Sequence, residues 1–283
     1  MSETLRLSTK MTSSATDAQH SPSDQSRLRR ITARCKKCRS ATAYRNENGL
    51  ENSNRVCLLH LFIALWERIG NPQNGGNFMI LEMRTYVLKP GMTANFVEKF
   101  AEGLTARLKF SRLLGLWQSE VGGLNRVVHV WPYESFEERE RIGNEARKTG
   151  MWPPKTQEFI VTQENKILQP APFSPPLPET KQGNIYEFRT YTYQPGTMPK
   201  VLEAFGKVIP ERAKLSPLIG VWVSAIGPLN QFIHVWAYRD AGERERVRAE
   251  ASKKVAGWPP ETRQYMVMQE NMLMTPSACT PFK

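Results

Sequence analysis

The stretch Glu82-Met83-Arg84-Thr85-Tyr86 is repeated 105 residues later as Glu187-Phe188-Arg189-Thr190-Tyr191. The same offset relates Gly115-Leu116-Trp117-Gln118-Ser119 to Gly220-Val221-Trp222-Val223-Ser224, and His129-Val130-Trp131 to His234-Val235-Trp236. After one inserted residue, Trp152-Pro153-Pro154 matches Trp258-Pro259-Pro260, and Gln163-Glu164-Asn165 matches Gln269-Glu270-Asn271. A repeat of this length is a whole small domain, well above the period of a solenoid. The chain is therefore expected to hold two copies of one fold.

Four segments follow from this repeat. Residues 1–77 form a basic leader that is rich in Ser, Thr, Asp and Gln at its start, so it is expected to be largely disordered. Residues 78–169 form repeat 1, and residues 184–283 form repeat 2. Between them, residues 170–183 are rich in proline and predict a stiff linker. Met79 lies at the very start of repeat 1 and is predicted as an alternative start of translation.

The charge of the chain is +12, with a pI near 9.7, and half of the excess lies in the leader, where 12 Lys/Arg face 6 Asp/Glu. The rest of the chain lacks the basic, aromatic-studded motifs of nucleic-acid-binding proteins, so no nucleic-acid partner is predicted. No apolar run reaches the roughly 18 residues that a membrane span requires. With only 4 cysteines, a reducing compartment is the simpler reading. We expect a cytoplasmic protein, or alternatively a mitochondrial one, because the leader is rich in Arg and Ser.

The leader also contains Cys35, Cys38, Cys57 and His60, whose spacing resembles a small zinc site. The last two lie inside an apolar run, which is typical of buried packing. The sequence therefore predicts no metal and no cofactor.

Hydrophobic periodicity predicts the same elements in both repeats. In repeat 1, strands are expected at 79–88, 115–121, 126–133 and 160–168, with helices at 93–113 and 136–148. In repeat 2, strands are expected at 184–193, 220–226, 230–238 and 265–274, with helices at 198–215 and 241–255. The order β-α-β-β-α-β is that of the ferredoxin-like unit, an α+β fold whose sheet carries helices on one face only. Two tandem units packed sheet to sheet would cover both bare faces as an internal pseudo-dimeric α/β barrel.

Alternation along the strands sorts the repeated residues into two faces. We expect the apolar side, with Leu81, Met83 and Val87, to pack against the helices. The opposite, bare face would then line the space between the sheets. It would carry Glu82, Glu187, Tyr133 and Tyr238 together with twelve candidate ligand-binding residues: Arg84, Tyr86, His129, Trp131, Gln163, Asn165, Arg189, Tyr191, His234, Trp236, Gln269 and Asn271.

Two interpretations of this polar-aromatic face stay open. In the first, Glu82, Arg84 and their equivalents bond one another and hold the two sheets in register. In the second, the inter-sheet cavity binds a small apolar or aromatic ligand, with His129 or His234 at its floor and Arg84 or Arg189 clamping an anion.

No G-x-S-x-G elbow, P-loop, dinucleotide-binding or H-E-x-x-H motif is present, so no catalytic residue is predicted and enzymatic activity stays open. The Glu-Arg-Glu-Arg runs at Glu138 and Glu243 predict solvated helix faces, and Trp117 and Trp222 predict packing.

Together these motifs resemble the NIPSNAP family: Tyr-Glu-Phe-Arg-Thr-Tyr-x-x-x-Pro-Gly from Tyr186, Gly-x-Trp-x-Ser, Leu-Asn-x-x-x-His-Val-Trp-x-Tyr and Gln-Glu-Asn-x-Leu/Met. The likeness covers residues 79–283. It implies a tandem ferredoxin-like fold of the dimeric α/β-barrel type, with no assigned catalytic residues. It further implies a non-catalytic binding or adaptor protein with a protein partner, and leaves association into a homo-oligomer open. The alternative is a small-molecule-handling barrel, similar to cofactor-independent monooxygenases or haem binders of this fold.

Overall fold

Both repeats form the same series of elements in the computed structural model, which describes residues 79–280. Repeat 1 contains β1 (Ile80–Leu88), α3 (Thr93–Arg107), β2 (Gly115–Val121), β3 (Arg126–Tyr133), α4 (Phe136–Lys148), the 3₁₀ turn η2 (Gln157–Phe159) and β4 (Ile160–Pro170). Repeat 2 contains β5 (Ile185–Tyr193), α5 (Met198–Ala213), β6 (Leu218–Ile226), β7 (Gln231–Tyr238), α6 (Ala241–Lys254), the 3₁₀ turn η3 (Arg263–Tyr265) and β8 (Met266–Pro276). The zinc-like cysteines and the predicted leader lie outside the described residues.

The boundaries agree with the sequence pattern to within a few residues, with one larger difference at the end of the first helix. This helix was expected to reach residue 113 but ends at Arg107. Residues 108–110 form a turn, and the chain then leads into β2. Leu113 and Leu114 are buried there, and the Leu114 amide donates to the Val130 carbonyl. The 3₁₀ turns before β4 and β8 were not predicted.

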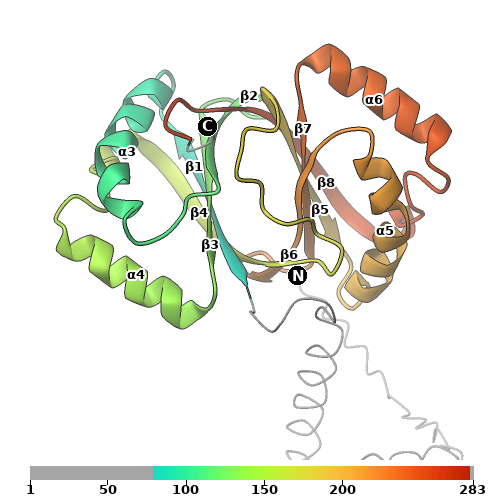
Figure 1. Ribbon diagram of the computed structural model, residues 1–283, viewed down its shortest axis with the longest axis horizontal. Coiled ribbons are helices and arrows are strands. Elements are labelled where there is room, and N and C mark those ends of the chain that lie inside the picture. Colours follow the sequence, from blue (N-terminus) through green and yellow to red (C-terminus); the bar gives the residue numbers. More distant parts are fainter. Residues whose placement is uncertain (1–78, 281–283) are drawn as a thin grey trace, which may run out of the picture. The chain divides into compact units, whose positions relative to one another are not determined.

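The eight strands of the described region close into one antiparallel barrel in the order β1-β3-β2-β8-β5-β7-β6-β4. Each repeat contributes four neighbouring strands, and the two seams are the pairs β2–β8 and β4–β6. Helices α3 and α4 cover one side of the barrel, and α5 and α6 cover the other (Figure 1). This arrangement confirms the predicted α+β fold of two ferredoxin-like repeats joined as an internal pseudo-dimer.

The first residues of the predicted stiff linker are hydrogen-bonded to the second repeat. Pro170 belongs to β4 and pairs with Trp222 of β6. The next amide, that of Ala171, donates to the Val221 carbonyl over 2.8 Å, and the Ser174 hydroxyl accepts from the Val221 amide over 3.0 Å. The connection thus reinforces the β4–β6 seam.

The predicted assignment of the two sheet faces was wrong. Leu81 and Met83 do not pack against the helices but point into the barrel, in a buried cluster that includes Tyr186, Phe188 and Trp222 of repeat 2. Glu82, Tyr86 and Trp131 lie on the outer face, under α3 and α4. The reason is access to water. The barrel interior is closed by strands on every side and so takes the apolar face, whereas the helix layer has open margins that long Arg and Tyr side chains can reach.

Each repeat also touches the last strand of the other through a hairpin turn. Gly122, in the turn after β2, has a φ of +92°, and a Cβ there would lie 2.3 Å from the Asn271 carbonyl oxygen. In the turn after β6, Gly227 has a φ of +101°, and a Cβ would lie 3.1 Å from the Asn165 carbonyl oxygen. Only glycine combines this backbone conformation with such a close approach. The Gln-Glu-Asn segments of β4 and β8 therefore lie beside the hairpin of the opposite repeat.

Candidate functional site

A buried carboxylate holds the centre of the helix–sheet layer in repeat 1. Glu82 on β1 is 4% exposed, and its Oε1 accepts from Arg84 on the same strand (2.9 Å), from Arg139 on α4 and from Asn165 on β4 (2.9 Å). Its Oε2 accepts from the Tyr133 hydroxyl over 3.3 Å. Burial alone would raise the pKa of Glu82, but the hydrogen bond and charge of Arg139 and the charge of Arg84 outweigh it and lower the pKa to about 2. The carboxylate is therefore ionised and fully bonded near neutral pH, where it is not a proton donor.

Repeat 2 builds the equivalent centre with more positive charge. Glu187 is 1% exposed, and its Oε1 accepts from Arg189 on β5 (2.8 Å) and from Arg244 (2.6 Å) and Arg248 (3.3 Å) on α6. Its Oε2 accepts from the Tyr238 hydroxyl over 3.3 Å. Burial raises the pKa of Glu187, but the hydrogen bond from Arg244 and the charge of Arg189 lower it overall. Three guanidinium groups thus converge on one carboxylate oxygen.

These networks correct two predictions. Glu82 and Glu187 were expected to hold the two sheets in register, but they bind each sheet to its own helix. The Glu-Arg-Glu-Arg runs were expected to be solvated, yet Arg139 and Arg244 turn inward to the buried carboxylates. The preceding glutamates act at the helix starts, because Glu138 and Glu243 each accept a backbone hydrogen bond of 2.6 Å there.

A second buried arginine lies deeper in each layer and was not singled out from the sequence. Arg107 on α3 is 2% exposed, lies 4.4 Å from the Trp131 ring centroid and donates to the Tyr133 hydroxyl over 2.8 Å. In repeat 2, Arg212 lies 4.1 Å from the Trp236 ring and donates to the Tyr238 hydroxyl over 3.2 Å. Burial lowers the pKa of both guanidinium groups. The only sequence signal is that both positions are arginine at the repeat offset.

The two histidines are buried donors without the properties of a general base. Trp131 Nε1 donates to His129 Nδ1 over 2.8 Å, and Trp236 Nε1 donates to His234 Nδ1 over 2.7 Å. These bonds place the imidazole proton on Nε2 in both rings. Burial, and then the charge of Arg84, lowers the pKa of His129 to about 3; burial and the charge of Arg189 lower that of His234 well below its ordinary value. Both rings are therefore neutral at physiological pH, and their lone pairs are occupied.

The twelve candidate ligand-binding residues fall into two groups, and neither lines the barrel interior. Tyr86, His129, Trp131, Tyr191, His234 and Trp236 are buried beneath the helices, whereas Gln163, Asn165, Gln269 and Asn271 are exposed on β4 and β8. Arg84 and Arg189 connect the groups, with side chains 40% and 14% exposed. The inter-sheet location was wrong, since apolar side chains of both repeats fill that space. A role of these residues in ligand binding stays a prediction.

Exposed apolar side chains of both repeats lie at the same end of the barrel. Because all neighbouring strands are antiparallel, the ends of β2 and β6 lie at the same end as the starts of β4 and β8. We call this the hairpin end. It carries seven large apolar side chains that are 48–67% exposed: Val121, Leu124, Val161, Ile226, Leu229, Val267 and Met268. Sequence reasoning missed this set, because nothing in the repeat pattern marks a hairpin tip as unusually exposed.

Within residues 79–280, the strand edges at the hairpin end also lack a second partner strand. Strand β6 pairs with β4 only over Ile167–Pro170, so the preceding β4 residues have a partner on the β1 side alone. Likewise, β2 pairs with β8 only from Leu273 to Pro276, which leaves the first part of β8 paired with β5 alone. The residues of β4 from Val161 to Asn165 are all exposed.

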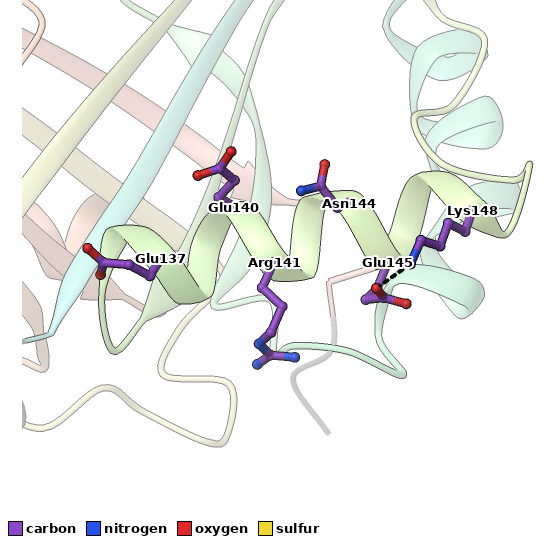
Figure 2. Close-up of a pocket in the computed structure, with 6 residues that line it drawn as sticks. All are labelled: Glu137, Glu140, Arg141, Asn144, Glu145 and Lys148. Atoms are coloured by element: carbon purple, nitrogen blue, oxygen red, sulfur yellow. Dashed lines mark hydrogen bonds and ion pairs between the residues drawn. The ribbon is translucent and has the colours of Figure 1, made fainter.

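The outer face of α4 forms an open depression (Figure 2). Its lining residues all come from this one helix: Glu137, Glu140, Arg141, Asn144, Glu145 and Lys148. Within it, Glu145 and Lys148 form an ion pair of 2.7 Å. A single helix supplies one wall only, so this face cannot enclose a small molecule.

Within residues 79–280, no group of three or more His, Cys, Asp or Glu side chains could hold a metal ion. In the same part of the chain, no helix is both long and apolar enough to cross a membrane.

Comparison with known proteins identifies both repeats. The NIPSNAP family model matches residues 81–175 and again residues 186–281. Protein NipSnap homolog 3B of Mus musculus is 30% identical over 223 residues, which cover 76% of this chain and 89% of that protein. Protein NipSnap homolog of Dictyostelium discoideum is 32% identical over 178 residues, or 62% and 76% of the two chains. The crystal structure of an anthrone oxidase-like protein matches with a TM-score of 0.50 at 10% identity, over 72% of this chain and 92% of that one, which shows a shared fold alone. The double match of the family model places this chain in the NIPSNAP family.

Proposed function

We propose that this chain is a non-catalytic binding protein of the adaptor type, which holds a protein partner at the hairpin end of the barrel. The observation that carries this proposal is the set of seven exposed apolar side chains contributed there by both repeats. Monomeric proteins seldom gather large exposed apolar residues in one region unless it serves an interaction. The buried polar groups of the two helix–sheet layers support a non-catalytic reading, because the histidines have no free lone pair and the carboxylates are fully bonded.

The free strand edges indicate what kind of partner fits. Val161 on β4 and Val267 on β8 are 59% and 66% exposed, beside backbone groups that no second strand of the described residues pairs with. An extended segment of another protein could add to such an edge, gaining backbone hydrogen bonds as well as apolar contacts. The partner we propose is therefore a protein that presents an extended, apolar segment.

The test uses the full chain and two variants in quantitative pull-downs. Leu124→Asp combined with Leu229→Asp places charge on both hairpin tips, and Leu108→Asp is the control, since Leu108 is also exposed (39%) but lies at the end of α3. We expect the same proteins to be recovered with the original chain and with the control, and to be lost from the double variant. Equal recovery with the double variant would contradict the proposal. Loss of self-association in the double variant, with no other protein affected, would also contradict it, because the occupant would then be a second copy.

The second candidate function is small-molecule handling by the polar-aromatic layers. It is favoured by the half-exposed position of Arg84, which connects solvent to the buried His129 and Tyr86. Native mass spectrometry and absorption spectra of the purified chain separate the two functions. A copurified small molecule or a Soret band would favour this candidate over the adaptor.

A further inference from the structure

The two carboxylate centres differ in charge although their strands match residue by residue. In repeat 1, two arginines and Asn165 bond Glu82. In repeat 2, Arg248 takes the place that Asn165 takes in repeat 1, so three arginines bond Glu187. The position equivalent to Arg248 in repeat 1 is Gly143, so the extra guanidinium belongs to repeat 2 alone.

The positive charge around Glu187 exceeds what that carboxylate can neutralise. Arg189, Arg244 and Arg248 each form an ion pair with Glu187, and within residues 79–280 they have no ion pair with another acid. Arg212 adds a fourth positive charge through the Tyr238 hydroxyl, which bonds both Arg212 and Glu187. Four guanidinium groups thus share one carboxylate, whereas three do so in repeat 1, where Arg107 bonds the Tyr133 hydroxyl that bonds Glu82. Like charges this close repel one another strongly where water is partly excluded, unless a further anion is present.

A buried donor in the same region also lacks an acceptor. His234 is 1% exposed, and its Nε2 has no hydrogen-bond partner within the described part of the chain. In repeat 1 the corresponding Nε2 of His129 faces the Tyr86 hydroxyl at 3.4 Å. In repeat 2 the matching Tyr191 hydroxyl accepts from Arg189 over 2.6 Å. The charges of Arg189, Arg212 and Arg248 all act on His234 and help to lower its pKa. Repeat 2 therefore has one guanidinium group more than repeat 1, and in addition a buried imidazole donor without an acceptor in the described part of the chain.

We propose that the surface formed by Arg189, Arg244 and Arg248 binds the phosphate group of a small molecule. The side chains of these arginines are 14%, 21% and 44% exposed, so an anion can reach them from solvent without unfolding the layer. A guanidinium group matches phosphate through paired N–H donors, and a dianion offsets most of the excess charge. Asn271, which pairs with Arg189 in the β5–β8 ladder and is exposed, adds an uncharged amide beside the site. This site lies between β5 and α6. Asn271 at its edge borders the Gly122 turn of the hairpin end, whereas the three arginines do not belong to the proposed adaptor surface.

The experiment titrates inorganic phosphate into the full chain at constant ionic strength, with chloride as the reference salt, and follows affinity by calorimetry and thermal stability. Arg248→Gln removes the guanidinium that is unique to repeat 2. Arg141→Gln is the control, because it removes an exposed arginine on α4 that has no contact with either buried carboxylate. We expect saturable binding that weakens about tenfold or more in Arg248→Gln, the loss expected for one charge-assisted hydrogen bond, and that is unchanged in Arg141→Gln.

Equal weakening in both variants, or no stabilisation beyond that of chloride, would overturn the proposal. Should Arg248→Gln fail to fold, Arg248→Lys keeps the charge but loses the paired donors and is expected to weaken binding as well. Phosphorus NMR of inorganic phosphate with the unmodified chain is a further check, and unbroadened phosphate signals would overturn the proposal.

Sedimentation with phosphatidylcholine vesicles, with and without phosphatidic acid, identifies the source of the phosphate. Binding to free phosphate without vesicle binding supports a soluble ligand, whereas binding to vesicles alone would contradict it.

Discussion

Trp117 of the first repeat packs edge-on against Phe188 of the second, with ring centroids 5.2 Å apart inside the barrel. Trp117 also contacts Tyr186, at 5.5 Å, and is completely buried. The predicted packing role of this tryptophan is confirmed, and the contact shows that the two repeats share one interior. Each sheet thus serves as the cover of the other, as expected for a single-faced α+β sheet that must bury its bare side.

Truncating this contact should destabilise the whole barrel. We expect Trp117→Ala to lower the free energy of unfolding by about 3–5 kcal/mol, the usual cost of deleting a fully buried large aromatic side chain. Urea unfolding followed by circular dichroism measures the change. Leu108→Ala, at an exposed position, should change it by less than about 1 kcal/mol. Equal effects of the two substitutions would show that the shared interior contributes little.

Replacing the buried carboxylate of repeat 1 should be equally damaging. In Glu82→Gln, Arg84 and Arg139 lose their counter-charge within the layer, so we expect a loss of about 3 kcal/mol or more. The control is Glu145→Gln on the outer face of α4, where the exposed pair with Lys148 should contribute less than about 1 kcal/mol. The two variants are compared by urea unfolding at neutral pH. A Glu82→Gln protein as stable as the control would mean that the network is not tightly bonded.

Acid should destabilise the protein by protonating His129 and Glu82. The pKa of His129 falls from an ordinary value of 6.5 to about 3 on folding, so below pH 6.5 the unfolded chain takes up a proton that the folded chain refuses. Stability should therefore fall with pH from about 6.5 toward 3, by about 1.4 kcal/mol per pH unit for this histidine. Glu82, with a pKa near 2 against 4.5, adds a further loss only as the pH falls from 4.5 toward 2.

Urea unfolding of the original chain and of His129→Gln at a series of pH values separates these contributions. The variant should show a shallower dependence between pH 6.5 and about 3, and an unchanged one below. The same slope in both proteins would indicate that His129 is protonated in the folded state.

The second helix of each repeat should lose stability when its N-cap residue is replaced. Ser135 Oγ accepts from the Glu138 amide over 3.1 Å, and Asp240 Oδ1 accepts from the Glu243 amide over 2.7 Å. Ser135→Ala and Asp240→Ala should each cost about 1 kcal/mol. Thermal melting of both variants measures this, and because the caps lie in separate repeats, the double variant should show the sum. A double variant no worse than either single one would contradict independent caps.

Much of the fold was predictable because the sequence states it twice. The repeated strand and helix patterns, with Pro-Gly turns, indicated the order of elements and the barrel of two repeats. The faces of the strands were not predictable from alternation alone. Alternation separates Leu81 from Glu82 but does not say which side meets the helices, and here the helices carry Arg107 and Arg139 toward the sheet. A helix that presents arginine to a sheet makes the polar side the covered one.

For the candidate site, only the participating residues were predictable from the sequence, and their bonding partners were not. Arg84, His129 and Trp131 do meet in one layer, but the partners that fix their chemistry lie far away in the sequence. Arg248 shows most clearly what could not be predicted from the sequence. It is an ordinary residue of a charged helix in the sequence, and only the structure brings it to Glu187. Exposure of Leu124 and Leu229 at hairpin tips likewise depends on how the barrel closes.

Hydrogen–deuterium exchange of the full chain tests the closed barrel most directly. Amides such as those of Ala171 and Ser277 donate across the β4–β6 and β2–β8 seams, to Val221 and Leu116. If the two repeats form one barrel, peptides that contain the seam strands should exchange only through global unfolding, as slowly as peptides from β1 and β5. Seam peptides that exchange rapidly while β1 and β5 stay protected would show two separate domains, and would contradict the shared interior.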